Sequence, residues 1–280
     1  MRKPKVIVIL GQTATGKSDL AVKIAKKING EIISADSRQI YKKLNIGTGK
    51  ITKKEMMGIP HHLLDVANPK RKFTVAEYQK KAIYAMAEII KKGKTPIICG
   101  GTGFYIEAVT KGMTFPGIPP NNKLRKSLIR NTTIVLFHKL QKLDSERAKT
   151  IDPKNKVRLV RAIEIAKTLG KVPKITEVKP PYKFIKIGLY LPPDILKKRI
   201  EKRVTKMFKE GLLAEIRKLK KTGVSDKRLK ELGFEYFNPT KEKVITETLK
   251  YAKRQMTWFK RDKEIKWLNA SEKINTKILR

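Results

Sequence analysis

The spacing of apolar residues predicts alternating strands and helices along the first third of the chain. Val6–Leu10 is an unbroken apolar run, typical of a parallel strand that is buried on both faces. Residues 17–28 follow with helical spacing, and Asn29-Gly30 is a typical helix end. The same reasoning predicts a strand at 31–35, a helix at 75–92 and a strand at 95–99. Such alternation indicates an α/β fold with a parallel sheet covered by helices.

The middle of the chain has a different pattern. Phe115–Pro120 is rich in proline and glycine, and residues 121–170 are predicted to be mainly helical. Later segments return to core-like patterns: a strand at 184–190, a long basic helix at 193–220, a helix at 241–260 and a short strand at 265–268. We therefore predict a discontinuous core domain, 1–115 plus 179–280, with a mostly helical domain inserted at 116–178.

The turn after the first strand matches the phosphate-binding pattern G-x-x-x-x-G-K-[ST] in full. Its glycines let successive backbone N–H groups converge on phosphate oxygens, and the following helix adds the positive end of its dipole. Lys17 supplies a cation, and the hydroxyl of Ser18 is a ligand for Mg²⁺. The predicted pyrophosphate-binding residues are Gly11, Thr13, Ala14, Thr15, Gly16, Lys17 and Ser18.

Charge and cysteine content indicate the kind of binding partner and the cellular compartment. Lysine and arginine total 66 against 25 acidic residues, a net charge of +41 in 280 residues, which favours a polyanionic partner such as nucleic acid. Because most of these cations are lysine, a compositional bias also contributes. A lone cysteine excludes an intrachain disulfide, and the run Val6–Leu10 is too short to span a bilayer. We expect a cytoplasmic protein that does not associate with membranes.

The phosphate loop alone leaves the reaction open. Most such loops bind ATP or GTP, so a small-molecule kinase is one hypothesis, and an RNA-binding protein that uses the loop as a switch is another. Against a nucleotide hydrolase, the strand at 95–99 leads into glycine instead of an aspartate for Mg²⁺. Asp36 follows the other strand, where a metal ligand, a helix cap and a general base are all reasonable roles.

Seven further blocks narrow the choice by resemblance. They are Asp36–Tyr41, Asn45–Lys50, Pro60–Asp65, Phe73–Tyr78, Gly100–Tyr105, Asn155 with Arg158–Glu164, and Ala252–Phe259. In this order and spacing the chain closely resembles the tRNA dimethylallyltransferases, or tRNA isopentenyltransferases, which have a P-loop NTPase-like fold. Departures are Gln12, where the family usually has proline, and Phe234, where it often has tyrosine.

The resemblance implies a reaction and assigns roles in it. A dimethylallyl group passes from dimethylallyl pyrophosphate to N6 of adenosine 37 in tRNA, with Mg²⁺ as cofactor. Lys17 and the phosphate loop would stabilise the departing pyrophosphate. Thr102 resembles the family's second hydroxyl contact to that group. Asp36 resembles the general base that accepts the proton of N6 as the N–C bond forms.

The resemblance also implies contacts with the tRNA anticodon stem-loop, made by a monomeric enzyme. The matching positions are Asp36, Ser37, Arg38, Gln39, Thr102, Arg125, Arg158, Arg161, Lys253, Arg254 and Gln255. Arg125, Arg158 and Arg161 fall in the helical insertion, and a surface pairing of Arg158 and Arg161 with Glu164 is the alternative reading.

Four other residue types invite a functional role that we do not assign. His61 and His62 have no third ligand at a recognisable spacing, so structural hydrogen bonding is the favoured interpretation. Cys99 is predicted to be a buried strand residue and not a nucleophile. Trp258 and Phe259 are predicted to be core residues instead of base-stacking ones.

Overall fold

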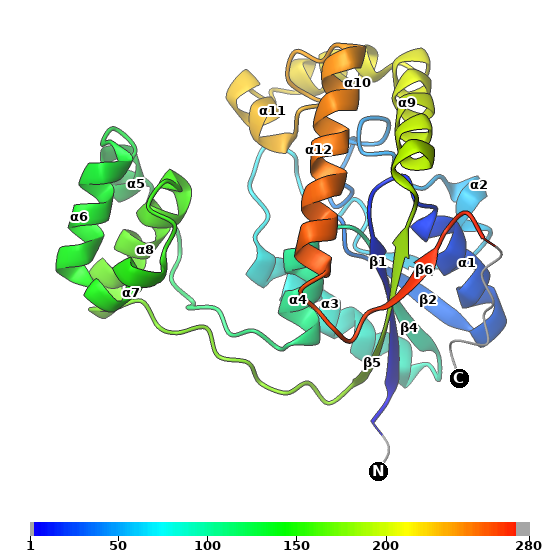
Figure 1. Ribbon diagram of the computed structural model, residues 1–280, viewed down its shortest axis with the longest axis horizontal. Coiled ribbons are helices and arrows are strands. Elements are labelled where there is room, and N and C mark those ends of the chain that lie inside the picture. Colours follow the sequence, from blue (N-terminus) through cyan, green and yellow to red (C-terminus); the bar gives the residue numbers. More distant parts are fainter. Residues whose placement is uncertain (1–2, 273–280) are drawn as a thin grey trace. The chain divides into compact units, whose positions relative to one another are not determined.

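The computed structural model describes residues 3–272 and contains a single parallel sheet in that range (Figure 1). The strand order is β3-β2-β4-β1-β5-β6, and every neighbouring pair is parallel. The strands are β1 (Lys5–Gly11), β2 (Gly30–Ser34), β3 (His61–His62), β4 (Thr95–Cys99), β5 (Lys183–Tyr190) and β6 (Lys266–Asn269). This confirms the α/β fold with a parallel sheet covered by helices.

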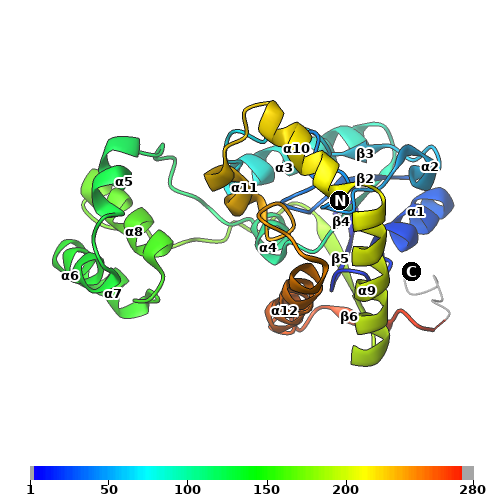
Figure 2. The same cartoon turned by 90° about the horizontal axis from the view of Figure 1, so that it is seen from above.

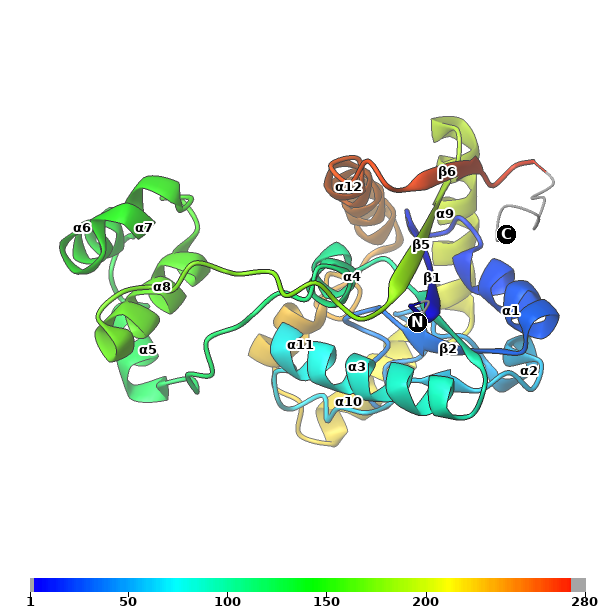
Figure 3. The same cartoon turned by 90° about the horizontal axis from the view of Figure 1, so that it is seen from below.

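Helices cover both faces of the sheet, because successive side chains of each strand point to opposite sides. Ile7 and Ile9 of β1 pack with helix α1 (Lys17–Ile28) on one face. Val6 and Val8 pack on the other face with α3 (Val75–Lys91) and α4 (Gly103–Thr110). Seen from below, α1 and α3 lie on opposite sides of the strands (Figure 3). The phosphate loop therefore emerges from the centre of a well-packed core.

The prediction of one long basic helix at 193–220 is wrong, because the structure has two helices there. Helix α9 (Pro193–Lys209) ends before Gly211, whose φ of +99° begins a new helix, α10 (Leu212–Lys221). A left-handed conformation of this kind favours glycine. Helices α2 (Lys53–Met56), α11 (Asp226–Leu232) and α12 (Lys241–Phe259) complete this part, and α9 packs against α12 (Figure 2).

Residues 113–178 form a compact unit of their own, and the other unit comprises the chain up to Gly112 and from Lys179 onward. The smaller unit contains α5 (Asn122–Leu128), α6 (Thr133–Leu143), α7 (Ser145–Thr150) and α8 (Lys156–Leu169), which group together (Figure 3). Leucines of α5, α6 and α8 form its own apolar core. Its ends are tied by backbone pairing, since Thr114 N–H donates to the carbonyl of Thr176.

The helices are amphipathic and not uniformly apolar. Helix α9 buries a stripe of Leu196, Ile200, Val204 and Met207, while most of its lysines are exposed. Between residues 3 and 272, the structure has no helix with the length and apolar character needed to cross a membrane.

Candidate functional site

The phosphate loop between β1 and α1 curls because three of its residues have positive φ. Gly11 has a φ of +131°, Ala14 of +61° and Gly16 of +84°. At Gly11 a Cβ would lie 2.2 Å from the Leu189 carbonyl oxygen, so only glycine allows this approach to β5. Helix α1 starts at Lys17, and no side chain caps its first N–H groups. The loop thus presents backbone donors and a positive helix end to an anion.

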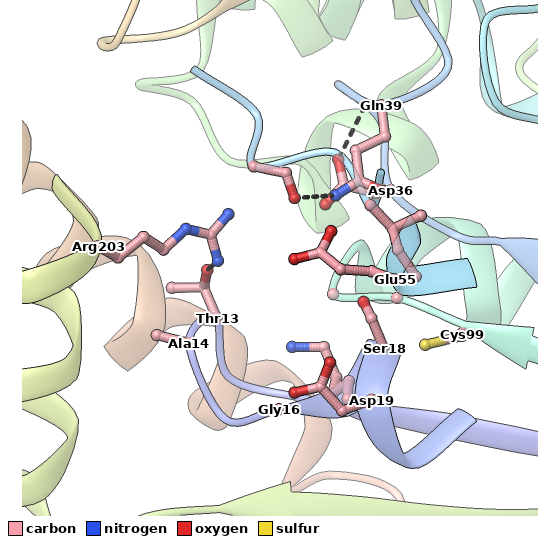
Figure 4. Close-up of a pocket in the computed structure, with 15 residues that line it drawn as sticks. Thr13, Ala14, Gly16, Ser18, Asp19, Asp36, Gln39, Glu55, Cys99 and Arg203 are labelled. Carbon is pink, nitrogen blue, oxygen red and sulfur yellow. Dashed lines mark hydrogen bonds between the residues drawn. The ribbon is translucent and has the colours of Figure 1, made fainter. Parts of the chain in front are cut away.

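A pocket opens in front of this loop (Figure 4). Its lining joins the phosphate loop to the ends of β2 and β4, to the segment around residues 49–55 and to α9. The lining residues are Thr13, Ala14, Gly16, Lys17, Ser18, Asp19, Asp36, Gln39, Gly49, Ile51, Glu55, Cys99, Gly100, Gly101 and Arg203. The predicted phosphate loop and the predicted base therefore line one pocket.

Lys17 is the loop's cation, and its side chain is half-buried. Burial lowers its pKa to about 8, and the nearby positive charge of Arg203 acts in the same direction, while Cys99 and Asp36 oppose the shift. Its ammonium group donates to the backbone carbonyl of Gln12. Because desolvation makes the charged form costly, a bound anion would be stabilised strongly by this group.

Arg203 lines the pocket and was not predicted from the sequence. Its guanidinium donates to Thr13 Oγ1 at 3.2 Å and to the Thr48 carbonyl at 3.0 Å. It points toward Thr13 at the pocket in Figure 4. The signal lay in its position: Arg203 falls in register with Leu196 and Ile200 on the apolar stripe of α9. A half-buried arginine in register with such residues indicates a specific partner.

Asp36 and Thr102 lie at the ends of neighbouring strands, β2 and β4. Asp36 Oδ1 accepts from the N–H groups of Arg38 at 2.8 Å and Gln39 at 3.3 Å. Thr102 Oγ1 accepts from the N–H of Ser37 at 2.9 Å. Asp36 thus closes a turn with one carboxylate oxygen, and no helix begins there, so the helix-cap alternative is wrong. In the described part of the chain, no hydrogen bond to Oδ2 is found.

The chain segments that follow β2 and β4 lie close together, because the glycines after β4 have no side chain to keep them apart. A Cβ on Gly100 would lie 2.2 Å from the Ala35 carbonyl oxygen. Gly101 adjoins the side chain of Gln255, and Gly103 adjoins the ring of Trp258. The glycine-rich turn after β4 therefore brings Thr102 next to the segment that begins at Asp36.

Two further ionisable groups surround Arg38. Burial raises the pKa of Glu235 to about 7; the charge of Asp36 adds to this shift, and Arg38 and Arg203 oppose it. Tyr251, on α12, lies beside Thr102, and burial raises the pKa of its hydroxyl. Neither residue belongs to one of the sequence blocks that resemble the family, so the sequence did not point to them.

Gln255 and Gln12 join α12 to the phosphate loop. Gln255 is buried; it accepts from the Thr13 N–H at 2.8 Å and donates to the Gly101 carbonyl at 2.9 Å. Gln12 donates to the Ala252 carbonyl at 3.3 Å. The structure thus shows that Gln255 stabilises the backbone on which the pocket is built. Its contact with tRNA stays a prediction.

Lys253 and Arg254, the other two predicted tRNA contacts on α12, are both exposed. The guanidinium of Arg254 lies 5.8 Å from the centre of the Tyr251 ring. Their side chains are accessible to a partner, in contrast to that of Gln255.

In the unit at 113–178, the predicted arginines differ in environment. Glu164 is buried, and its carboxylate accepts from Arg125 Nε at 2.8 Å and Nη2 at 2.6 Å. Arg161 also donates to Glu164. Arg158 is exposed. The alternative of pairing with Glu164 therefore holds for Arg161 and also for Arg125, but not for Arg158. The tRNA contacts of all three arginines stay predictions.

The residues to which no functional role was assigned have structural partners. His61 and His62 bond to the Ile59 carbonyl and to Glu31, at 2.8 and 2.7 Å. No cluster of three or more histidine, cysteine or acidic groups suited to a metal occurs within residues 3–272. Burial raises the pKa of Cys99 to about 12, which makes it a poor nucleophile. Phe259 belongs to the core, and Trp258 packs against it.

Comparison with known proteins decides the family. The sequence profile described as IPP transferase matches residues 39–262 of this chain. The chain belongs to the IPP transferase family. The resemblance seen in the sequence is thereby confirmed, and so is the P-loop NTPase-like fold that it implied.

Relatives of this IPP transferase family member carry a common name. A tRNA dimethylallyltransferase of Pelotomaculum thermopropionicum is 38% identical, with 95% of this chain and 91% of that protein covered. One of Caldanaerobacter subterraneus is 41% identical, with coverage of 94% and 91%.

Solved structures agree with these sequence relatives. The tRNA isopentenylpyrophosphate transferase of Bacillus halodurans has a TM-score of 0.72 and 35% identity, covering 99% of this chain and 94% of that one. A eukaryotic dimethylallyltransferase acting on tRNA has a TM-score of 0.79 and 28% identity, with coverage of 95% and 74%.

Proposed function

We propose that this enzyme transfers a dimethylallyl group from dimethylallyl pyrophosphate to N6 of adenosine 37 in tRNA, releasing pyrophosphate. The observation that carries the proposal is the shared pocket: a phosphate-binding loop and a strand-end carboxylate, Asp36, line the same cavity. The names of the relatives supply the substrate class, since they are tRNA dimethylallyltransferases.

The pyrophosphate of the prenyl donor is assigned to the phosphate loop. Lys17, Arg203 and residues of this loop line the pocket, and the N–H groups at the start of α1 have no side-chain cap. When the bond between C1 of the allyl group and the pyrophosphate oxygen breaks, negative charge develops on the leaving group. Fixed donors in a partly desolvated pocket stabilise that charge more than they stabilise the bound donor, which lowers the barrier.

Mg²⁺ fits the donor set of this pocket. Ser18 follows Lys17 at the start of α1, and the carboxylates of Asp19, Asp36 and Glu55 also line the cavity. Mg²⁺ is usually held by one or two protein groups together with substrate phosphates and waters, so a dedicated cluster of ligands is not needed. Ser18 would hold the ion, which would neutralise charge on the pyrophosphate.

Asp36 is the proposed general base. Its Oδ1 is fixed by two backbone N–H groups, which orients the carboxylate without using Oδ2. As the bond between N6 and C1 forms, the amino group becomes acidic and its proton passes to Asp36. Thr102, held beside Ser37, and Gln39, on the pocket wall, are the proposed contacts around the acceptor base.

The tRNA itself is proposed to bind through the basic surface and the helical unit at 113–178. The net charge of +41 favours a nucleic-acid partner, and exposed Arg158, Lys253 and Arg254 are available for phosphate contacts. The target base has to leave its stack to reach the pocket. All pocket residues belong to the unit that contains the sheet. The proposed enzyme acts as a monomer on tRNA in the cytoplasm.

A transfer assay tests this function. The protein is incubated with labelled dimethylallyl pyrophosphate, Mg²⁺ and unmodified tRNA, with AMP as a parallel acceptor. We expect label in tRNA with a retained adenosine at position 37 and none after its replacement by guanosine. Hydrolysis of ATP stimulated by a small metabolite, with no label in tRNA, would favour a kinase instead.

A further inference from the structure

Three successive backbone N–H groups in the segment 45–50 converge on one carboxylate from a distant helix. Asn45 and Ile46 donate to Glu215 Oε2 at 2.9 and 2.8 Å. Gly47 donates to Oε1 of the same residue at 3.1 Å. Consecutive N–H groups of this kind form a concave anion-binding nest. Here the anion is Glu215 of α10, so the nest is filled by the protein itself.

Tyr236 fixes this carboxylate from the other side. Its hydroxyl donates to Glu215 Oε1 at 2.9 Å, and its side chain is 1% exposed. The ring packs so closely on Gly47 that a Cβ there would lie 2.7 Å from it. With four hydrogen bonds on one side chain, the backbone at 45–47 has little freedom to shift.

The held segment carries carbonyl groups that position pocket side chains. The Thr48 carbonyl accepts from Arg203 at 3.0 Å and from Gln39 at 3.4 Å. The Gly49 carbonyl accepts from Gln39 at 3.3 Å. Both Arg203 and Gln39 line the pocket. The nest is thus connected through one or two residues of backbone to the pyrophosphate side and to the side assigned to the base.

We propose that Glu215 is a positioning residue for the transfer reaction, holding residues 45–49 so that Arg203 and Gln39 point into the pocket. The inference rests on the proposed function for the identity of the substrates. Glu215 does not line the pocket itself. Its effect on catalysis therefore passes through the carbonyl groups of Thr48 and Gly49, and a displacement of even 1 Å there is costly for the rate.

The test compares Glu215→Ala and Glu215→Gln with Glu210→Ala. Glu210 is an exposed glutamate near the start of α10 that forms an ion pair with exposed Lys206. Binding of inorganic pyrophosphate with Mg²⁺ is measured by calorimetry. We expect Glu215→Ala to weaken it by about tenfold to a hundredfold, and Glu215→Gln by less, because one acceptor oxygen remains. Glu210→Ala should stay within about twofold of the wild type.

Steady-state kinetics separates positioning from a general loss of stability. Glu215→Ala should raise the KM for the prenyl donor and lower kcat in the fraction that remains folded at the assay temperature. Wild-type pyrophosphate affinity and kcat in a folded Glu215→Ala protein would overturn the inference. If that variant does not fold, Gly47→Ala tests the same contact from the other side, by forcing the backbone against Tyr236; unchanged pyrophosphate binding in it would again overturn the inference.

Hydrogen exchange of the wild-type protein gives a test that needs no variant. The amides of Asn45, Ile46 and Gly47 should exchange slowly; exchange at unprotected rates would contradict the nest. Neither this measurement nor pyrophosphate binding requires transfer. A wild-type protein that fails to prenylate tRNA would therefore defeat the proposed function. Pyrophosphate binding and hydrogen exchange would still decide the role of Glu215.

Discussion

Replacing Gln255 by leucine should destabilise the phosphate loop from beneath. The side chain accepts from the Thr13 N–H at 2.8 Å and donates to the Gly101 carbonyl at 2.9 Å. Leucine fills similar space but leaves both backbone groups without a partner. Each unsatisfied buried group costs about 1–3 kcal/mol, so we expect a loss of about 2–6 kcal/mol in the free energy of unfolding. That is a large part of the stability of a typical domain.

Denaturant unfolding followed by tryptophan fluorescence measures this loss. Trp258 and Trp267 both lie in the unit that contains the sheet, so they report on its unfolding. Arg254→Ala is the matched control on the same helix, because Arg254 is exposed: it should change the unfolding free energy by less than about 0.5 kcal/mol. If Gln255→Leu kept wild-type stability and pyrophosphate affinity but lost tRNA binding, the support role would be refuted and the predicted tRNA contact favoured.

Two further predictions concern titrating groups. The pKa of Lys17 is lowered to about 8, so its charge is lost as the pH rises through that value; pyrophosphate affinity measured by calorimetry should fall there relative to Lys17→Arg, and parallel profiles would contradict this. Burial acts to raise the pKa of Glu164, but hydrogen bonds from Arg125 and Arg161 outweigh it and lower the pKa. The stability that Glu164 adds is thus present above the unfolded-state pKa and lost as pH falls through the folded-state value. Glu164→Gln should remove about 1–3 kcal/mol from the unit at 113–178, measured by hydrogen exchange of α5 and α8, and unchanged protection would refute it.

Local features of the chain predicted much of the fold. The run Val6–Leu10 and the glycine-rich loop after it marked β1 and the start of α1, because burial on two faces and positive φ each require particular residue types. The break at Gly211 escaped prediction, since the apolar spacing continues across it from α9 into α10. A glycine within a periodic pattern does not by itself show which backbone conformation it adopts.

The site residues also fall into those that the sequence predicted and those that it did not. Lys17, Ser18 and Asp36 were predictable because a short motif or a strand end carries them, and the structure places all three on one pocket. Arg203 and Glu215 were not, because their partners at residues 13 and 45–48 are remote in sequence. Only the packing of α9 and α10 against the first part of the chain brings these groups together, and that packing follows from tertiary structure.

The transfer rate of the Asp36→Asn variant tests most directly whether Asp36 is the general base. Asparagine keeps an Oδ1 that accepts from the N–H groups of Arg38 and Gln39, so the turn survives and only the base is lost. In single-turnover transfer to tRNA, we expect pyrophosphate affinity within about twofold of the wild type and a transfer rate lower by about 10²–10⁴. A variant that prenylates tRNA at the wild-type rate would contradict the claim that this carboxylate accepts the proton of the acceptor nitrogen.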